Sequence, residues 1–448
     1  MLSKINYLKN MKHYFIGALL LVFNFGICVA QEEGAVSLSF SLDEAVDYAL
    51  INNTDILNAK LDIQFAKKEV WKTTAIGLPQ ATGKLDYQHI PGDLPTFSFP
   101  NGDGTFSDIP LGVKNSSTYS LTVSQLVFSG EYIVGLQAAR TYLELSENSE
   151  KKSVQDIKAN VISSYYTILV LEKNKEILDS SFVNMKNTLI ETKALMEAGF
   201  LEDTDYEQIL ISHNGLENSS KAVGRQIEIG YLLFKVNLGI GIETEVNLSE
   251  SMDDLLLDLN METLMAEEFI LDNNLDYQIL STQEKVSELS LKREKTKFLP
   301  SLSAFYLYSD KTNKAAFDFT INHILGLNLG VPVFSSGQRL ATVSQARIDL
   351  EKSQNIKLQV GETLVMAVEQ ARSDFKTAWE KYQTEYQNIQ LAKKIYAKTL
   401  IKYKEGVASS MDVTQANNQY LNNTSAYSTS IIDMLNAKTS LEKAISNL

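Results

Sequence analysis

The chain has 448 residues, of which 44% are hydrophobic, and its formal net charge is −14. This length and composition allow two or three ordinary domains with sizeable apolar cores, and they exclude a largely disordered chain. The acidic charge argues against nucleic-acid binding, because proteins that bind nucleic acid gain most of their affinity from basic surfaces.

Residues 1–30 have the features of a secretory signal peptide. Three lysines precede an apolar run that ends at the small residue Ala30, before the polar Gln31. Cleavage there removes three lysines and no acidic residue, so the net charge falls from −14 to −17. A membrane anchor is the alternative, although the apolar run is short and no stop-transfer segment follows it.

The only cysteine, Cys28, lies inside this segment, so the mature chain is expected to contain no thiol. Attachment of lipid at Cys28 is a second possibility for this segment. The bulky Ile27 before it fits poorly with the small residue that such a site requires.

The first structural repeat is predicted over residues 31–237 and starts with a helix. Ser41 can cap this helix, the polar run at 52–55 interrupts it, and Pro79 ends it. Apolar and polar residues then alternate over about 80–128, which predicts two strands of a hairpin. Their length of about 9–11 residues is what a tilted strand needs to cross a bilayer. Between the strands, the proline-rich run from Pro91 to Pro110 predicts a loop.

A very long helix is predicted over about 131–198, because this stretch contains no proline and repeats its apolar residues every seven positions. At roughly 1.5 Å per residue it would be about 100 Å long. A strict seven-residue repeat requires helical partners along its length. One seam position holds Val154, Val161, Ile168, Lys175, Phe182, Leu189 and Met196, and the other holds Ile157, Ser164, Leu171, Leu178, Met185 and Thr192.

A return helix is predicted over about 203–237, after a turn in which Gly199 suits the left-handed conformation. A linker over 238–261 follows, with a short helix predicted around Met252 to Leu259.

The second repeat, 262–448, has the same order of elements. Adding 221 to Asn53 and Pro79 gives Asn274 and Pro300, and adding 207 to Ile168 gives the equally apolar Phe375. The change of offset assigns about fourteen extra residues to the loop of the first hairpin. The second repeat is predicted to contain a helix from about Leu264, a hairpin at about 301–333, a long helix at about 337–405 and a return helix at about 411–447.

One face of the second hairpin is predicted to contact lipid. Leu325, Leu327, Leu329 and Val331 alternate with small or polar residues.

Four strands are too few to close a barrel, and an open sheet edge in lipid leaves backbone groups unsatisfied. The chain is therefore expected to oligomerise. A soluble sandwich of the two hairpins is the alternative, and it leaves the long helices unexplained. The predicted fold class is α+β, mainly α.

The ordered landmarks of both repeats resemble a TolC-type outer-membrane efflux protein. The landmarks are Leu78-Pro79, Phe128 to Gly130, Arg140 and Gly199 to Asp205 in the first repeat, and Leu299-Pro300, Phe334 to Gly337, Arg347 and Gly406 to Asp412 in the second. The resemblance covers nearly the whole mature chain.

This resemblance implies a homotrimer whose twelve strands form one barrel in the outer membrane, continued by a periplasmic barrel of coiled-coil helices. It also implies two partners, a periplasmic adaptor protein and an inner-membrane transporter, with the chain as the exit duct for small molecules. The outer-membrane duct of a type I protein secretion system has the same architecture and stays open as an alternative. A periplasmic coiled-coil adaptor and a structural coiled-coil protein fit less well, because neither needs the alternating strands.

In the resembled family, the turns at the ends of the long helices contact the adaptor. The resemblance assigns adaptor docking to Gly199, Phe200, Leu201, Gly406, Val407 and Ala408. The alternative is that these residues only end the helices.

The resemblance also assigns a periplasmic gate near the second turn. Asp412 matches the first of two aspartates that ring the mouth in the family, whereas Gln415 replaces the second. Asp205 and Asp412 are equally interpretable as caps of the return helices. Tyr403 matches a tyrosine of the closed mouth, but Ala408 replaces its arginine partner, which favours a place for Tyr403 in an aromatic seam.

No enzymatic site is predicted. The mature histidines His89, His213 and His323 are widely separated, and no glycine-rich phosphate loop is present. Neither a cofactor nor a bound metal is expected.

Overall fold

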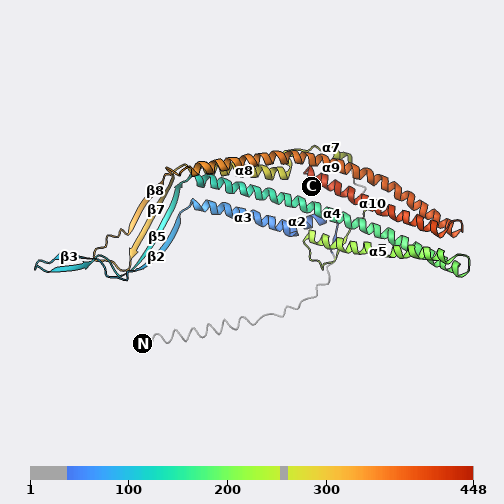
Figure 1. The fold of residues 1–448 in the computed structure, drawn as a ribbon, viewed down its shortest axis with the longest axis horizontal. Helices are drawn as coiled ribbons and strands as arrows, with labels where there is room; N and C mark the ends of the chain where they lie inside the picture. Colours follow the sequence, from blue (N-terminus) through green and yellow to red (C-terminus); the bar gives the residue numbers. More distant parts are fainter. Residues whose placement is uncertain (1–37, 253–260, 447) are drawn as a thin grey trace, which may run out of the picture.

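A computed structural model describes residues 38–252, 261–446 and 448. The predicted signal peptide, Cys28 and all but the first residue of the short helix predicted at 252–259 lie outside the described residues. The chain is elongated, with a sheet at one end and paired helical tips at the other (Figure 1).

Each repeat contains helices, a strand pair and a very long helix that returns at a tip. The elements are β1 (Leu38–Phe40), α2 (Leu42–Asn52), α3 (Thr54–Ile76), β2 (Gln80–His89), β3 (Thr96–Pro100), β4 (Phe106–Pro110), β5 (Asn115–Phe128), α4 (Gly130–Glu197), α5 (Asp203–Leu238), β6 (Val246–Leu248), α7 (Met261–Ala266), η1 (Leu271–Asn273), α8 (Leu275–Thr296), β7 (Ser301–Lys311), β8 (His323–Gly330), α9 (Gln338–Lys404) and α10 (Ser410–Ala444).

The two long helices, α4 and α9, contain 68 and 67 residues, so each is about 100 Å long. The predicted seam of α4 faces the protein interior: Val161, Ile168, Met185 and Thr192 are fully buried. In α9 the equivalent row buries Phe375, Ile389, Tyr396 and Tyr403.

The main sheet has the order β2-β5-β7-β8, with antiparallel neighbours throughout. The helices that continue from these strands pack in the same order, α3-α4-α8-α9. Toward the tips, α5 packs against the side of α4, and α10 packs between α4 and α9. The chain is therefore a curved wall, one element thick at the sheet.

Two asparagines join helices end to end, at positions that the repeat relates to each other. The Asn53 side chain accepts hydrogen bonds from Asp55 N and Ile56 N at the start of α3, and it donates to the carbonyl of Asn237 at 2.7 Å. Asn274 caps α8 in the same way and donates to the carbonyl of Ala444 at 3.4 Å.

Gly239 shows how close this junction is. Its φ is +74°, and a Cβ on it would lie 2.4 Å from the carbonyl oxygen of Asn52. Glycine is required both for the left-handed backbone and for the approach of α5 to the start of α3.

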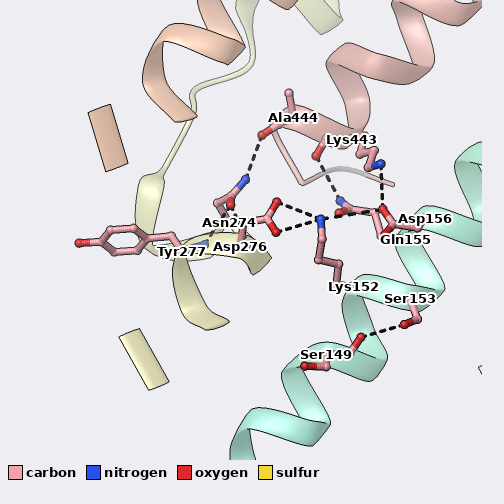
Figure 2. A network of polar contacts seen from close by, with 10 residues as sticks. All are labelled: Ser149, Lys152, Ser153, Gln155, Asp156, Asn274, Asp276, Tyr277, Lys443 and Ala444. Atoms are coloured by element: carbon pink, nitrogen blue, oxygen red, sulfur yellow. Dashed lines mark hydrogen bonds and ion pairs between the residues drawn. The ribbon is translucent and has the colours of Figure 1, made fainter. Parts of the chain in front are cut away.

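A polar network joins α4, α8 and α10 at the second junction (Figure 2). Lys152 lies 2.9 Å from a carboxylate oxygen of Asp276 on α8, and Lys443 on α10 lies 2.8 Å from Asp156. Gln155 donates to the carbonyl of Lys443 at 3.2 Å. The network holds the end of α10 against the middle of α4.

The core beside these junctions is covered by a small sheet that the sequence did not predict. Strand β1 pairs with β6 in parallel, bringing the start of the first repeat onto the linker. The buried Tyr165 donates toward the carbonyl of Phe40 at 3.2 Å and lies 3.0 Å from a carboxylate oxygen of Glu250. The same Glu250 oxygen accepts from the backbone N–H of Leu42 at 2.9 Å.

Two sequence predictions were wrong in detail. The run from Pro91 to Pro110 is not only loop, because β3 and β4 form an additional hairpin within it. The first helix of the second repeat, predicted as one element from about Leu264, is interrupted. The short α7 and η1 come first, and α8 starts at Leu275, because the Asn274 cap fixes its N-terminus.

Substitution Asn53→Ala should lower the free energy of unfolding by about 2 kcal/mol, since it removes a helix cap and one buried interhelical hydrogen bond. Circular dichroism of the detergent-solubilised protein in urea measures this change. Asn58→Ala, on the exposed side of α3, is the control and should change it by less than about 0.5 kcal/mol. Equal stability of the two variants would contradict the role of Asn53 in joining α5 to α3.

Candidate functional site

The strand register sorts the main sheet into an apolar face and a polar face, because residues directly opposite each other in antiparallel strands point the same way. Tyr306 pairs with Leu325 and with Val123, and Val123 pairs with Ala81. The apolar face contains Ala81, Leu85, Tyr87, Tyr119, Leu121, Val123, Ala304, Tyr306, Tyr308, Leu325, Leu327 and Leu329.

The predicted lipid-contacting residues lie on this face or at its end. Leu325 is 83% exposed and Leu327 is 71% exposed, and Leu329 is similarly uncovered. Val331 lies just beyond β8 and is also exposed. No described part of the chain covers these side chains, so the face is a continuous apolar surface of the kind that marks a membrane or protein contact.

The opposite face carries mostly small and polar side chains. Its members include Thr82, Lys84, Asp86, Ser120, Thr122, Ser124, Ser303, Ser309 and Asn328, together with the apolar Phe305 and Leu307. Apolar residues on one face and polar residues on the other are the pattern of a barrel strand between lipid and a water-filled lumen.

Both outer strands of this sheet have a free edge. Within the described residues, β2 pairs only with β5, and β8 pairs only with β7. Their outward N–H and C=O groups need partners if the apolar face is in lipid, where an unsatisfied backbone group costs several kcal/mol.

Aromatic and polar side chains mark the loop end of the sheet. The Tyr306 hydroxyl lies 2.7 Å from Nδ1 of His323, and the Tyr119 hydroxyl donates to Asp310 at 2.9 Å. Such residues suit the boundary between hydrocarbon and water, because an apolar ring carries a polar end.

At the other end of the molecule, both tips have the same glycine turn. Gly199 and Gly406 have φ values of +79° and +72°, as predicted for left-handed caps. The next residue of each turn closes it, since Phe200 N donates to the carbonyl of Leu195 at 2.9 Å and Val407 N donates to that of Lys402 at 2.8 Å.

The residues assigned to adaptor docking are brought together at these tips. Phe200 is 78% exposed and Val407 is 73% exposed, whereas Leu201 and Ala408 are half-buried beside them. Each turn therefore presents one large apolar side chain to solvent.

The two tips are held side by side by polar contacts. The Ser410 hydroxyl donates to the Asp205 carboxylate, and Ser212 donates to the Thr414 hydroxyl at 3.1 Å. The contact between Asp205 and Ser410 was not predicted, because the turns are separated by about two hundred residues. Its one signal is that both residues lie at the start of a return helix.

Asp412, assigned to the gate, forms a capping box with Ser409. One carboxylate oxygen of Asp412 accepts from Ser409 N at 2.9 Å, while Asp412 N donates to the Ser409 hydroxyl at 3.2 Å. The hydrogen bonds from the Ser409 N–H and hydroxyl lower the pKa of Asp412 below its usual range. Asp412 is exposed and stays charged at neutral pH, and the exposed Gln415 lies one turn further along α10.

Tyr403 lies away from this exposed surface. It is 9% exposed, and its hydroxyl is 2.8 Å from that of Thr192 on α4. Burial raises the pKa of Tyr403. This position agrees with the aromatic seam interpretation, and any role of Tyr403 in a gate is a prediction.

Solved structures with the same fold include membrane channels and outer-membrane proteins. The chain matches crystal structures of CusC with a TM-score of 0.72 at 15% identity, covering 93% of this chain and 95% of that one. It matches the Campylobacter jejuni CmeC outer membrane channel with a TM-score of 0.71 at 18% identity, covering 90% and 85%. For the Vibrio cholerae outer membrane protein VceC the TM-score is 0.72 at 15% identity, covering 90% and 95%. These identities establish the fold.

The family model of outer membrane efflux proteins matches residues 270–447, which is nearly all of the second repeat. A comparison with curated protein sequences gave no match. The chain therefore shares its fold with these proteins, and its second repeat is similar to the outer membrane efflux family. The resemblance to the TolC-type efflux proteins that the sequence indicated is confirmed by these comparisons.

Within residues 38–252 and 261–446, no helix combines the length and the apolar composition of a membrane-spanning helix.

The tip glycines should tolerate little change. Gly199→Ala and Gly406→Ala are expected to cost roughly 1 kcal/mol each, since an alanine Cβ is strained at positive φ although open space surrounds it. Gly215→Ala, in the middle of α5 and equally open, should instead be neutral or stabilising. Thermal unfolding followed by circular dichroism compares the three variants, and the same melting temperature for all of them would refute the cap assignment.

A charge on the apolar face should prevent membrane assembly. Leu327→Lys is expected to reduce the amount of assembled protein in outer-membrane fractions at least tenfold, because a charge facing hydrocarbon costs roughly 2–4 kcal/mol in each copy. Asn328→Lys places the same charge on the neighbouring residue, which faces the opposite side, and should assemble normally. Normal assembly of both variants would overturn the assignment of the lipid face.

Proposed function

We propose that this chain is one subunit of a homotrimeric exit duct that passes small molecules from a periplasmic adaptor and an inner-membrane transporter to the exterior. The observation that carries the proposal is the main sheet, which has an apolar face and two free edges. Three copies joined edge to edge would satisfy both edges and enclose the polar face.

Helix surfaces support the same arrangement. In the row α3-α4-α8-α9, the two outermost helices carry exposed apolar side chains that other copies would cover. These include Leu57, Leu61 and Phe65 on α3, and Leu340, Ile348, Ile356, Leu358 and Met366 on α9. On α5, which flanks the wall toward the tips, Ile211, Ile229, Leu233 and Val236 are also exposed.

Adaptor docking is proposed at the tips. The exposed Phe200 and Val407 lie on turns whose backbone is fixed by glycine caps, so these side chains are presented without a large loss of loop entropy on binding. A helical hairpin that docks against each turn would use such apolar anchors.

The gate is proposed around Asp412. In a trimer, three copies of this exposed carboxylate at the mouth would repel one another and favour cations, an effect that salt weakens. Asp205 is hydrogen bonded to Ser410 in the same region, so its contribution is mainly to hold the two tips together.

The duct and its gate can be tested with planar bilayers. The reconstituted chain should give discrete conductance with cation selectivity, and Asp412→Asn should lower that selectivity as much as Asp412→Ala. The lowered pKa of Asp412 means that its charge persists as the pH falls toward the usual aspartate value of about 4 and is lost only below it. The reversal potential under a salt gradient, measured between pH 3 and pH 7, reports both effects.

The two substitutions separate charge from helix capping. Asparagine keeps an acceptor for Ser409, whereas alanine does not, so only the alanine variant should also lose stability. Absence of conductance from the wild-type chain would refute the duct, and a selectivity loss confined to Asp412→Ala would remove the charge of Asp412 from the gate.

A further inference from the structure

The first and second repeats contact each other along β5 and β7 in the sheet and along α4 and α8 in the helices. In this contact, here called the repeat joint, Leu121 lies opposite Tyr308 and Thr122 lies opposite Leu307. The free edges of the chain carry the equivalent elements. By the repeat, β8 and α9 correspond to β5 and α4, while β2 and α3 correspond to β7 and α8. The edges of two copies can therefore form the same contact.

The strand registers fix the offsets that relate the two hairpins. In the first hairpin, Gly83 lies opposite Leu121. Adding 221 to Gly83 gives Ala304. Adding 206 to Leu121 gives Leu327, which lies opposite Ala304 in the second hairpin. The offset is 206 here and 207 in the long helices, because the second repeat has one extra serine before its long helix.

The helices beside the hairpins follow offsets of 221 and 207. Tyr132 at the start of α4 packs so closely against Gly77, just beyond α3, that a Cβ there would clash with its hydroxyl. The equivalent residues are Arg339 and Phe298, and the Arg339 guanidinium lies 5.4 Å from the centre of the Phe298 ring. The same offsets can therefore be applied to the contact between α4 and α8.

Near the sheet, α4 and α8 are in contact through Lys292, which donates to Gln137 at 3.1 Å. Subtracting 221 from Lys292 gives Trp71 on α3, and adding 207 to Gln137 gives Ser344 on α9. Trp71 is 62% exposed and Ser344 is also exposed, so this chain alone covers neither side chain. In a contact between copies, the small Ser344 would leave room for the bulky Trp71.

Further from the sheet, Asn148 of α4 donates to Thr282 of α8 at 3.3 Å. The equivalent residues are Asn355 on α9 and Leu61 on α3, and both are exposed. Leu61 and Trp71 are therefore exposed apolar side chains on the face of α3 that corresponds to the covered face of α8. Apolar side chains that lie together on a surface mark a contact site, and the repeat indicates which element covers them.

We propose that neighbouring copies reproduce the repeat joint, with β8 and α9 of one copy packed against β2 and α3 of the next. The offsets then place Leu327 opposite Tyr87 of the next copy, and Asn328 opposite its Asp86. On the helices, the contact described for α4 and α8 recurs between α9 and the α3 of the next copy. The inference rests on the proposed duct and adds the register of its subunit contact.

The proposed register keeps both faces of the sheet continuous from copy to copy. Leu327 and Tyr87 both belong to the apolar face, whereas Asn328 and Asp86 both belong to the polar face. A shift by one residue would place apolar side chains of one copy beside polar side chains of the next.

The register is tested with pairs of cysteines, since the only native cysteine, Cys28, lies in the predicted signal peptide. Asn328→Cys combined with Asp86→Cys should form disulfides between copies when the reconstituted channel is oxidised. The matched controls combine Asn328→Cys with Lys84→Cys or Gln88→Cys, on the same face but two positions away. Opposite Cβ atoms are about 5 Å apart and diagonal ones about 7–8 Å, beyond the reach of a disulfide. Within one chain, β2 and β8 are about 14 Å apart, which excludes an intrachain bond.

Covalent trimer on a gel without reductant should be at least tenfold more abundant for the proposed pair than for either control. A conducting channel that is linked through a control position, or through none of the three, overturns the register and leaves the duct intact. A chain that neither conducts nor becomes linked overturns both.

The helix contact is tested by fluorescence. Trp379→Phe leaves Trp71 as the only tryptophan, and Ser344→Cys carries a bimane dye, which tryptophan quenches at short range. Within one chain, α3 and α9 are the outermost helices of the row and lie roughly 24–30 Å apart, so only Trp71 of another copy is close enough. Adding Trp71→Phe should raise the bimane emission at least twofold. Unchanged emission from channels that conduct would refute the contact between α9 and α3.

Discussion

The backbone of the four-stranded sheet sets the main constraint on this protein. In the proposed membrane position its apolar face lies in hydrocarbon, where each unpaired N–H or C=O group is costly, yet within the described residues β2 and β8 each have one unpaired edge. A soluble sheet can leave an edge in water, where solvent satisfies it, but a sheet in lipid cannot. The exposed apolar side chains of α3, α5 and α9 add a second requirement for a partner. An apolar helix face in water needs to be covered, as an open strand edge in lipid needs to be paired.

The two repeats have the same order of main elements, but they differ in detail. Each repeat has an asparagine that joins two helices end to end, a Leu-Pro pair before a strand and a glycine turn at the tip. Within the described residues, the ion network of Lys152, Asp276, Asp156 and Lys443 lies at one of the two junctions, and the β3–β4 hairpin occurs in the first repeat alone. The copies are therefore equal in topology and unequal in how firmly their helices are joined.

Much of this fold could be predicted from the sequence, because its strongest determinants are periodic. Seven-residue spacing located α4 and α9 to within about a residue at each end, and alternation of apolar residues located the strands of the main sheet. The repeat offset placed Asn274 opposite Asn53, and the structure shows the same cap at both positions. Gly199 and Gly406 were identifiable because few other residues adopt a left-handed cap.

What escaped prediction depends on contacts between distant segments. The parallel pairing of β1 with β6 involves only three residues in each strand, too few to show a period. The hairpin β3–β4 was concealed by prolines at its ends, which are compatible with strand edges as well as with loops. The contact between Ser410 and Asp205 depends on how two tips pack, and a single sequence carries no record of such packing.

The two asparagine junctions separate the continuous helices of the wall from the interrupted ones. Helices α4 and α9 run without interruption from the sheet to the tips, whereas α5 meets α3, and α10 meets α8, through one asparagine side chain each. A continuous helix resists bending along its whole length, but a joint of a few hydrogen bonds yields locally. A displacement of the tips therefore reaches the strands through α4 and α9, the two helices that pass both junctions without a break.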